Sequence, residues 1–172
     1  MRKIVLISSL ALFSTFSNAQ TDDNKCAANY SIYKEFLNVE SYHNAVNSFR
    51  IVLNDCPQFS KTVYIDGVKI YKGLISKTTD ANLINAYVDT IKTIYAKRIE
   101  NYGEEAQCLS RMAFDVMKLR KSDTAYSEAF NIFEKSVALG GENTDLSTFS
   151  AYFQLATTLS AQKKLTNEKL FN

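Results

Sequence analysis

Three cysteines are the residues of this sequence with the most distinctive chemistry. Cys26 stands just before the first predicted helix, and Cys56 ends the second. Because those two points lie side by side in an antiparallel helical hairpin, we favour a disulfide between them over two buried thiols. Such a bridge would close a loop of about 31 residues and stabilise the fold by roughly 3–4 kcal/mol. Cys108 lies inside a later helix, and we expect a buried thiol there rather than a nucleophile.

The other residue types with catalytic potential do not form a site pattern in the sequence. His43 is the only histidine, so neither a histidine-rich metal site nor a catalytic triad is expected. Glu104 and Glu105 are adjacent and face different sides of a helix, which disfavours an acid–base pair. The five glycines are scattered or paired at a helix end, so no phosphate-binding loop is present. We expect no catalysis, no cofactor and no metal site.

The first nineteen residues have the pattern of a cleaved export signal. Arg2 and Lys3 precede an apolar run over residues 4–16. Residues 17–19, Ser-Asn-Ala, then supply small side chains at the cleavage-determining positions. We predict cleavage after Ala19 and export to the periplasm or out of the cell. An uncleaved membrane anchor is disfavoured, because the run is about 13 residues long and a span needs about 20.

The composition favours a helical protein with a hydrophobic core. Only 5 glycines and 1 proline occur in 172 residues, so few tight turns are expected, and 46% of the residues are hydrophobic. The formal net charge of +2 falls to zero once Arg2 and Lys3 are removed, because 18 basic and 18 acidic residues remain. This balance disfavours a nucleic-acid partner. No later segment is apolar enough to span a bilayer.

Apolar residues recur at helical spacing along the rest of the chain, residues 26–172. The pattern predicts an all-α domain of about seven helices, after a flexible lead-in at residues 20–25. Short connections make neighbouring helices antiparallel, so we expect stacked hairpins. Gly67 and Gly73 weaken the third helix by about 1 kcal/mol each if exposed, which points to a close packing partner. The expected helices cover approximately residues 27–37, 42–56, 58–77, 81–102, 104–119, 123–139 and 145–161.

The second predicted helix carries a more specific pattern, Tyr42-x2-Ala45-x3-Phe49-x7-Pro57. This resembles the second half of a tetratricopeptide repeat (TPR), a helical hairpin of about 34 residues. In that family the small residue lets the two helices of a hairpin approach closely. The aromatic residue fills the gap to the next hairpin, and the proline ends the helix. The resemblance implies a solenoid of stacked hairpins.

Part of the pattern recurs later as Tyr126-x2-Ala129-x3-Phe133, with Gly141 in the place of the proline. Ala45 and Ala129 are 84 residues apart, which is not a multiple of the repeat length. An irregular helical bundle is therefore the alternative to a regular repeat array.

The chain is also similar to exported TPR proteins of the Bacteroidetes. The similarity is carried by residues 29–36 (NYSIYKEF), Cys56-Pro57, residues 64–70 (YIDGVKI) and residues 97–100 (KRIE). Those proteins are generally longer, and this chain ends inside an apparent eighth helix that starts at Leu165. The resemblance implies that the 172 residues are an N-terminal portion of such a protein.

The TPR resemblance implies a role in binding other proteins. In such arrays the first helices of the hairpins line the concave surface. We expect aromatic and basic side chains of the first and third predicted helices to project there toward a protein or peptide partner. For each tyrosine, packing between helices is the alternative. The expected partner-binding residues are Tyr30, Lys34, Lys61, Tyr64 and Tyr71.

These observations favour an exported protein–protein interaction module without catalytic activity. The alternative is a secreted helical carrier that holds an apolar small ligand between its hairpins. A closed apolar cavity of several hundred Å³ would favour the carrier. An open groove lined by the first helices would favour the interaction module.

Overall fold

The protein folds entirely into helices over the part of the chain that the structure describes. The computed structural model describes the backbone of residues 17–165 and the side chains of residues 24–165. The all-α class and the seven α-helices predicted from the apolar pattern are confirmed. The helices are α1 (Ser17–Asn38), α2 (Tyr42–Asp55), α3 (Lys61–Ser76), α4 (Ala81–Tyr102), α5 (Glu105–Leu119), α6 (Ala125–Gly140) and α7 (Leu146–Ala161), with a short 3-10 helix η1 (Gly141–Asn143).

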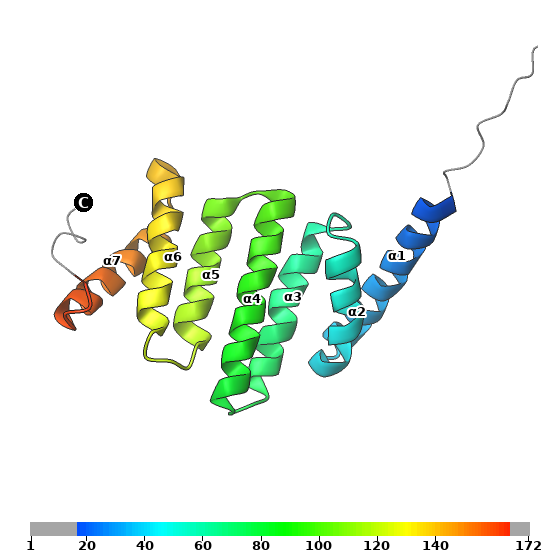
Figure 1. The fold of residues 1–172 in the computed structure, drawn as a ribbon, viewed down its shortest axis with the longest axis horizontal. Coiled ribbons are helices and arrows are strands. Elements are labelled where there is room, and N and C mark those ends of the chain that lie inside the picture. The colour runs from blue at the N-terminus through cyan, green and yellow to red at the C-terminus, as the bar shows by residue number, and fades with distance from the viewer. Residues whose placement is uncertain (1–16, 166–172) are drawn as a thin grey trace, which may run out of the picture.

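The helices stand side by side in chain order as antiparallel hairpins (Figure 1). The most extensive packing joins α1 with α2, α3 with α4, and α5 with α6. Consecutive hairpins then meet through α2 and α3, and through α4 and α5, while α7 packs on α6. Each hairpin therefore contacts mainly its neighbours in the sequence, which is the arrangement of a helical solenoid.

Helix α1 begins earlier than the sequence pattern predicts. It starts at Ser17, so residues 20–25, predicted as a flexible lead-in, are helical. The prediction was wrong because it required an apolar stripe, and the first turns of α1 project beyond the α1–α2 hairpin (Figure 1), where no stripe is needed. Residues 1–16, which hold most of the predicted export signal, lie outside the described part of the chain.

Polar caps and glycines mark the helix ends. Ser60, Asp80 and Asp145 precede α3, α4 and α7, and each side chain accepts a hydrogen bond from a backbone N–H of the first turn. Gly103 and Gly141 follow α4 and α6 with φ of +70° and +51°, a region that glycine adopts without strain. These residues fix where the chain reverses and therefore which helices become neighbours.

Two aromatic rings of α2 occupy gaps over the glycines of α3. Phe49 is fully buried, and its ring lies where a Cβ atom on Gly67 would stand. The ring of Tyr42 lies in the same relation to Gly73. Both glycines are thus sites of close approach between the first and second hairpins, as their cost in a helix indicated.

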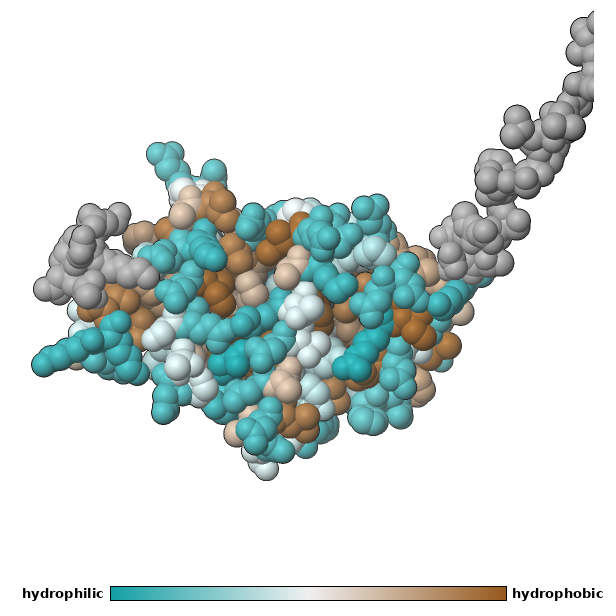
Figure 2. Space-filling model, viewed as in Figure 1, coloured by the Kyte–Doolittle hydropathy of each residue, from teal (hydrophilic) through white to brown (hydrophobic). Residues whose placement is uncertain are grey.

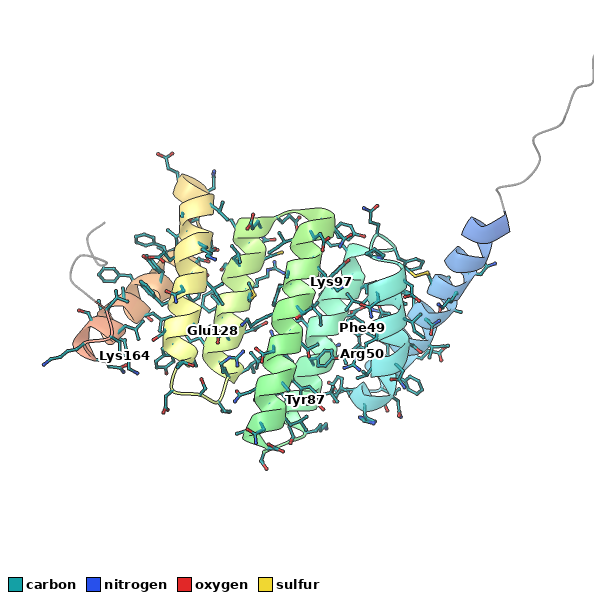
Figure 3. All side chains as sticks on the ribbon, in the orientation of Figure 1. Phe49, Arg50, Tyr87, Lys97, Glu128 and Lys164 are labelled. Atoms are coloured by element: carbon teal, nitrogen blue, oxygen red, sulfur yellow. A yellow bond between two sulfur atoms is a disulfide. The ribbon has the colours of Figure 1, made fainter. Side chains whose placement is uncertain are left out.

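The ring of Phe49 belongs to an aromatic cluster inside the array (Figure 3). Tyr33 of α1 and Tyr71 of α3 meet it edge-on, with ring centroids 5.8 and 6.3 Å from its own. Edge-to-face pairs at such distances add to the stabilisation that burial alone provides. One side chain therefore links α1, α2 and α3.

A disulfide closes the first hairpin. Cys26 of α1 is bonded to Cys56, which follows α2, and their Cα atoms are 6.2 Å apart (Figure 3). Lys25 and Asp55, the residues that precede these cysteines, form an ion pair of 2.7 Å between Nζ and Oδ2. Cys108 is a free thiol buried in α5, and burial raises its pKa.

The α7 end of the array exposes apolar side chains. Leu146 is 82% exposed, and Phe149 and Phe153 of the same helix are also more than half exposed. Hydrophobic surface is visible at this end of the molecule (Figure 2). The two ends of the array therefore differ, since the first hairpin is closed by a covalent bond.

We expect Gly67→Ala to lower the free energy of unfolding by about 1–2 kcal/mol. The added methyl group would overlap the buried Phe49 ring, and this overpacking outweighs the gain of about 1 kcal/mol in helix propensity. Chemical denaturation followed by circular dichroism measures the change. In a Phe49→Leu background the same substitution should cost less, because the smaller side chain leaves room. An equal cost in both backgrounds would contradict the packing described.

Thiol titration of the denatured, unreduced protein should count one free thiol, that of Cys108.

Replacing Cys26 and Cys56 together by serine should lower the free energy of unfolding by roughly 3–4 kcal/mol, the loop-closure contribution for about 31 residues. Cys108→Ala is the matched control, since it leaves the bridge intact. A count of three free thiols in the unreduced protein would rule out the disulfide.

Candidate functional site

A groove lies between α3 and α5, the first helices of the second and third hairpins. Its volume is about 470 Å³. Helix α4 contributes two buried side chains, Tyr95 and Arg98. The walls are formed by Tyr64, Ile65, Val68, Lys69 and Lys72 of α3 and by Arg111, Phe114, Asp115 and Lys118 of α5.

Cations outnumber carboxylates in the groove. Five lysine and arginine residues line it, against a single carboxylate, Asp115. Lys69, Arg111 and Lys118 are exposed, and none of the three forms an ion pair within the described residues. The ammonium group of Lys118 lies 5.4 Å from the centre of the Phe114 ring. The groove therefore has a positive potential that the protein itself does not neutralise.

The one carboxylate of the groove, that of Asp115, already has a hydrogen-bond donor and an ion-pair partner. Asp115 is buried, accepts a hydrogen bond of 3.0 Å from the Tyr95 hydroxyl, and pairs with Lys72 at 2.6 Å. Burial and the neighbouring carboxylate raise the pKa of Tyr95. The Tyr95 hydroxyl therefore keeps its proton and remains a donor to Asp115.

The same arrangement occurs one hairpin earlier. Asp66 of α3 is buried, accepts a hydrogen bond of 3.2 Å from Tyr33, and pairs with Lys34 of α1 at 3.0 Å. Burial and Asp66 raise the pKa of Tyr33. In both cases a lysine on the first helix of one hairpin forms an ion pair with a buried aspartate on the first helix of the next hairpin. The Lys34–Asp66 pair therefore joins α1 to α3, and the Lys72–Asp115 pair joins α3 to α5.

Arg98 brings a buried positive charge to the groove. Its side chain is 6% exposed, and its Nη2 donates to Glu104 at 2.7 Å. Its Nε is buried and has no hydrogen-bond partner in the part of the chain that the structure describes. Glu104 also accepts from Lys61 at 2.8 Å, and the hydrogen bonds from Lys61 and Arg98 lower its pKa to about 2. One exposed carboxylate thus balances two cations.

The second helices of the hairpins carry ion pairs between lysine or arginine and carboxylate side chains. Between α4 and α6, Lys92 pairs with Glu128 (Figure 3), and Arg120 pairs with both Asp89 and Glu128. The Nε of Arg120 is 2.8 Å from Oε2 of Glu128. Lys97 and Lys135, also on α4 and α6, form no ion pair within the described residues. What distinguishes the α3–α5 groove is that three unpaired cations line the same groove.

The prediction that Tyr64 and Tyr71 project toward a partner was wrong. Both side chains are only 1% exposed. The Tyr64 hydroxyl donates to the backbone oxygen of Pro57 at 2.6 Å, and burial raises the pKa of Tyr64 to about 12. The Tyr71 hydroxyl accepts a hydrogen bond from Nε of Arg50 at 3.1 Å. Tyr64 borders the groove but is a packing residue, because α3 is buried on most of its sides.

The other three predicted residues are accessible but do not line the groove. Tyr30 is half-buried, with ring centroids of Tyr33 and Phe59 each 5.2 Å away. Lys34 and Lys61 are partly exposed, and each is already paired with a carboxylate. The structure therefore does not bring the five predicted residues together into one site.

Sequence reasoning missed the basic residues that line the groove. Lys69 and Lys72 are three apart on α3, and Arg111 and Lys118 are seven apart on α5, so each pair lies on one helix face. This spacing was a usable signal, because the two residues of each pair project from the same side of their helix. The missing information was that α3 and α5 face each other across the groove.

Clusters of metal-binding side chains and membrane-spanning helices are both absent from the described residues. No group of three or more histidine, cysteine, aspartate or glutamate side chains there is arranged to hold a metal ion. Among the described helices, none combines the length and the hydrophobicity needed to cross a bilayer. His43 is exposed on α2.

Comparison of the chain with models of known protein families, with curated proteins and with solved structures finds no match. The resemblance to TPR proteins therefore stays a prediction from the residues themselves.

Lys61→Met should raise the pKa of Glu104 from about 2 toward its ordinary value of 4.5, because one of its two hydrogen-bond donors is lost. Carbon-detected NMR titration of the Glu104 carboxyl measures the change. In the wild type, the stabilisation linked to this depressed pKa is present above pH 4.5 and is lost as the pH falls toward 2. Lys97→Met, at a lysine outside the groove, should leave the pKa of Glu104 near 2. A pKa unchanged by Lys61→Met would contradict the contact.

Proposed function

We propose that the protein is an exported, non-catalytic module for protein–protein interaction, built as a TPR-like array of helical hairpins. Its contact surface is the groove between α3 and α5. The observation that carries this proposal is the composition of the groove. It is lined by first helices of consecutive hairpins and holds three exposed cations that have no carboxylate partner in the described part of the chain. Such a surface is suited to contacts with another protein.

The packing of the first hairpin supports the TPR-like assignment. Ala45 and Phe49, the small and aromatic residues of the pattern on α2, are both fully buried. Phe49 contacts Gly67 in the next hairpin, which is the role that the family gives to this aromatic position. In the second occurrence of the pattern Ala129 and Phe133 are also fully buried, although Phe133 contacts Phe114 of its own hairpin, at 4.9 Å between centroids.

The proposed export has two independent supports. The first is the signal pattern of residues 1–19, and the second is the pairing of Cys26 with Cys56, since structural disulfides persist in oxidising compartments. Cleavage after Ala19 would remove the first three residues of α1 and leave a helix that runs from Gln20 to Asn38. The bridge lies within the part that remains.

The properties of the groove favour an interaction module over a carrier of an apolar ligand. A carrier requires an enclosed apolar cavity, whereas the groove is open to solvent and lined by five cationic side chains. An apolar ligand placed there would remove Lys69 and Arg111 from water without offering them a partner, which is unfavourable.

A pull-down with matched charge variants tests the proposed contact surface. The exported protein, carrying a C-terminal affinity tag, is compared with Lys69→Glu/Arg111→Glu and with Lys97→Glu/Lys135→Glu. The second variant makes the same charge change outside the groove, on α4 and α6 (Figure 3 labels Lys97). We expect partners retained by the wild type and by the control to be reduced at least tenfold by the groove variant.

Circular dichroism and thermal unfolding establish that both variants keep the fold, as expected for exposed or half-buried side chains without ion-pair partners among the described residues. Equal retention of partners by all three proteins would show that the groove is not the contact surface. Equal loss in both variants would point to unspecific attraction by charge instead.

A further inference from the structure

We infer that the groove between α3 and α5 binds an acidic, extended peptide segment, whose carboxylates are held by Lys69, Arg111 and Lys118 close to the buried guanidinium of Arg98. The inference rests on the proposed function and names the chemistry of its partner.

The first step is the distribution of charge along the groove. Asp115 cannot neutralise the exposed cations, because Lys72 and the Tyr95 hydroxyl already occupy it at 2.6 and 3.0 Å. Lys69 reaches the groove from α3, and Arg111 and Lys118 reach it from α5. Cations on both walls favour a ligand that places anionic groups between the two helices.

The second step is the state of Arg98. Its side chain is only 6% exposed, and its buried Nε has no hydrogen-bond partner among the described residues. A buried donor without an acceptor is rare and unfavourable. Its only ion-pair partner in the described residues, Glu104, is exposed and shared with Lys61. A carboxylate in the groove would offset the positive charge that Glu104 offsets only in part.

The third step separates a peptide from other anions. Ile65, Val68 and Phe114 line the same groove, so a ligand with apolar atoms between its charges gains contacts that an inorganic anion cannot make. A single-stranded nucleic acid needs an aromatic face on which bases stack. Phe114 does not offer one freely, because the ammonium group of Lys118 lies over its ring and Phe133 packs against it with a centroid distance of 4.9 Å.

Fluorescence anisotropy with short synthetic probes tests the inference on the exported protein. The probe is a labelled decapeptide of alternating glutamate and leucine, and the reference has glutamine in place of each glutamate. We expect saturable binding of the acidic probe at least tenfold tighter than that of the reference. Affinity should fall as salt is raised, since exposed ion pairs are screened.

Matched variants connect the binding to the groove. Lys69→Glu/Arg111→Glu should weaken binding of the acidic probe at least tenfold, and Lys97→Glu/Lys135→Glu should change it less than twofold. Arg98→Met should also weaken binding while leaving the helical signal unchanged. Should Arg98→Met prove unstable, Lys118→Glu is the second variant, because Lys118 is exposed on the groove wall.

Several outcomes would overturn the inference. They are equal binding of acidic and neutral probes, equal loss in both double variants, full competition by phosphate at the same total charge, and tighter binding of a single-stranded oligonucleotide. If the acidic probe fails while the pull-down partner still depends on Lys69 and Arg111, only the acidic chemistry is wrong. If both fail, the proposed interaction surface is wrong as well.

Discussion

The contact between the Phe49 ring and Gly67 is the constraint on which the relative position of the first two hairpins depends. The ring fills a space that any Cβ atom on Gly67 would occupy, so a larger residue there would force α2 and α3 apart or displace the ring. Tyr42 over Gly73 repeats this contact farther along α3, so the two helices approach closely at two points. Since α3 forms one wall of the groove, the position of that wall is set by packing in the hairpin before it.

A second set of contacts joins the first helices of consecutive hairpins through buried ion pairs and hydrogen bonds. Asp66 and Asp115 are buried, and each receives a tyrosine hydroxyl and a lysine ammonium group, the lysine coming from the preceding first helix. A buried carboxylate without both partners would be unfavourable, so each unit specifies which helices are neighbours. The same contacts occupy Asp66 and Asp115, and within the described residues Lys69 and Arg111 have no ion-pair partner. The contacts that hold the first helices together therefore also use the carboxylate that could have neutralised the groove.

The sequence predicted much of the fold and little of the site. Apolar periodicity located all seven of the described α-helices, and the expected antiparallel hairpin indicated that Cys26 and Cys56 face each other. Cys26 lies inside α1 rather than before it, because the helix begins at Ser17. The failures share one physical cause. Periodicity does not show that α3 is enclosed on most of its sides, so Tyr64 and Tyr71 were assigned to the surface although they are core residues. Nor does it show that Lys69 and Arg111, on different hairpins, face the same groove. The balanced charge expected once Arg2 and Lys3 are removed also gave no sign of the local excess of cations in this groove.

The disulfide gives the array two unequal ends. In a solenoid each unit is held mainly by its neighbours, so loss of structure starts at the terminal units and spreads inward. At the α1 end such opening is limited, because Cys26 and Cys56 keep α1 and α2 together even when their packing is lost. Within the described residues α7 is held by packing on α6, and part of its apolar surface faces water. Among the described helices, loss of packing would therefore begin more readily at α7 than at the covalently closed hairpin, which would persist as the template on which α3 re-forms.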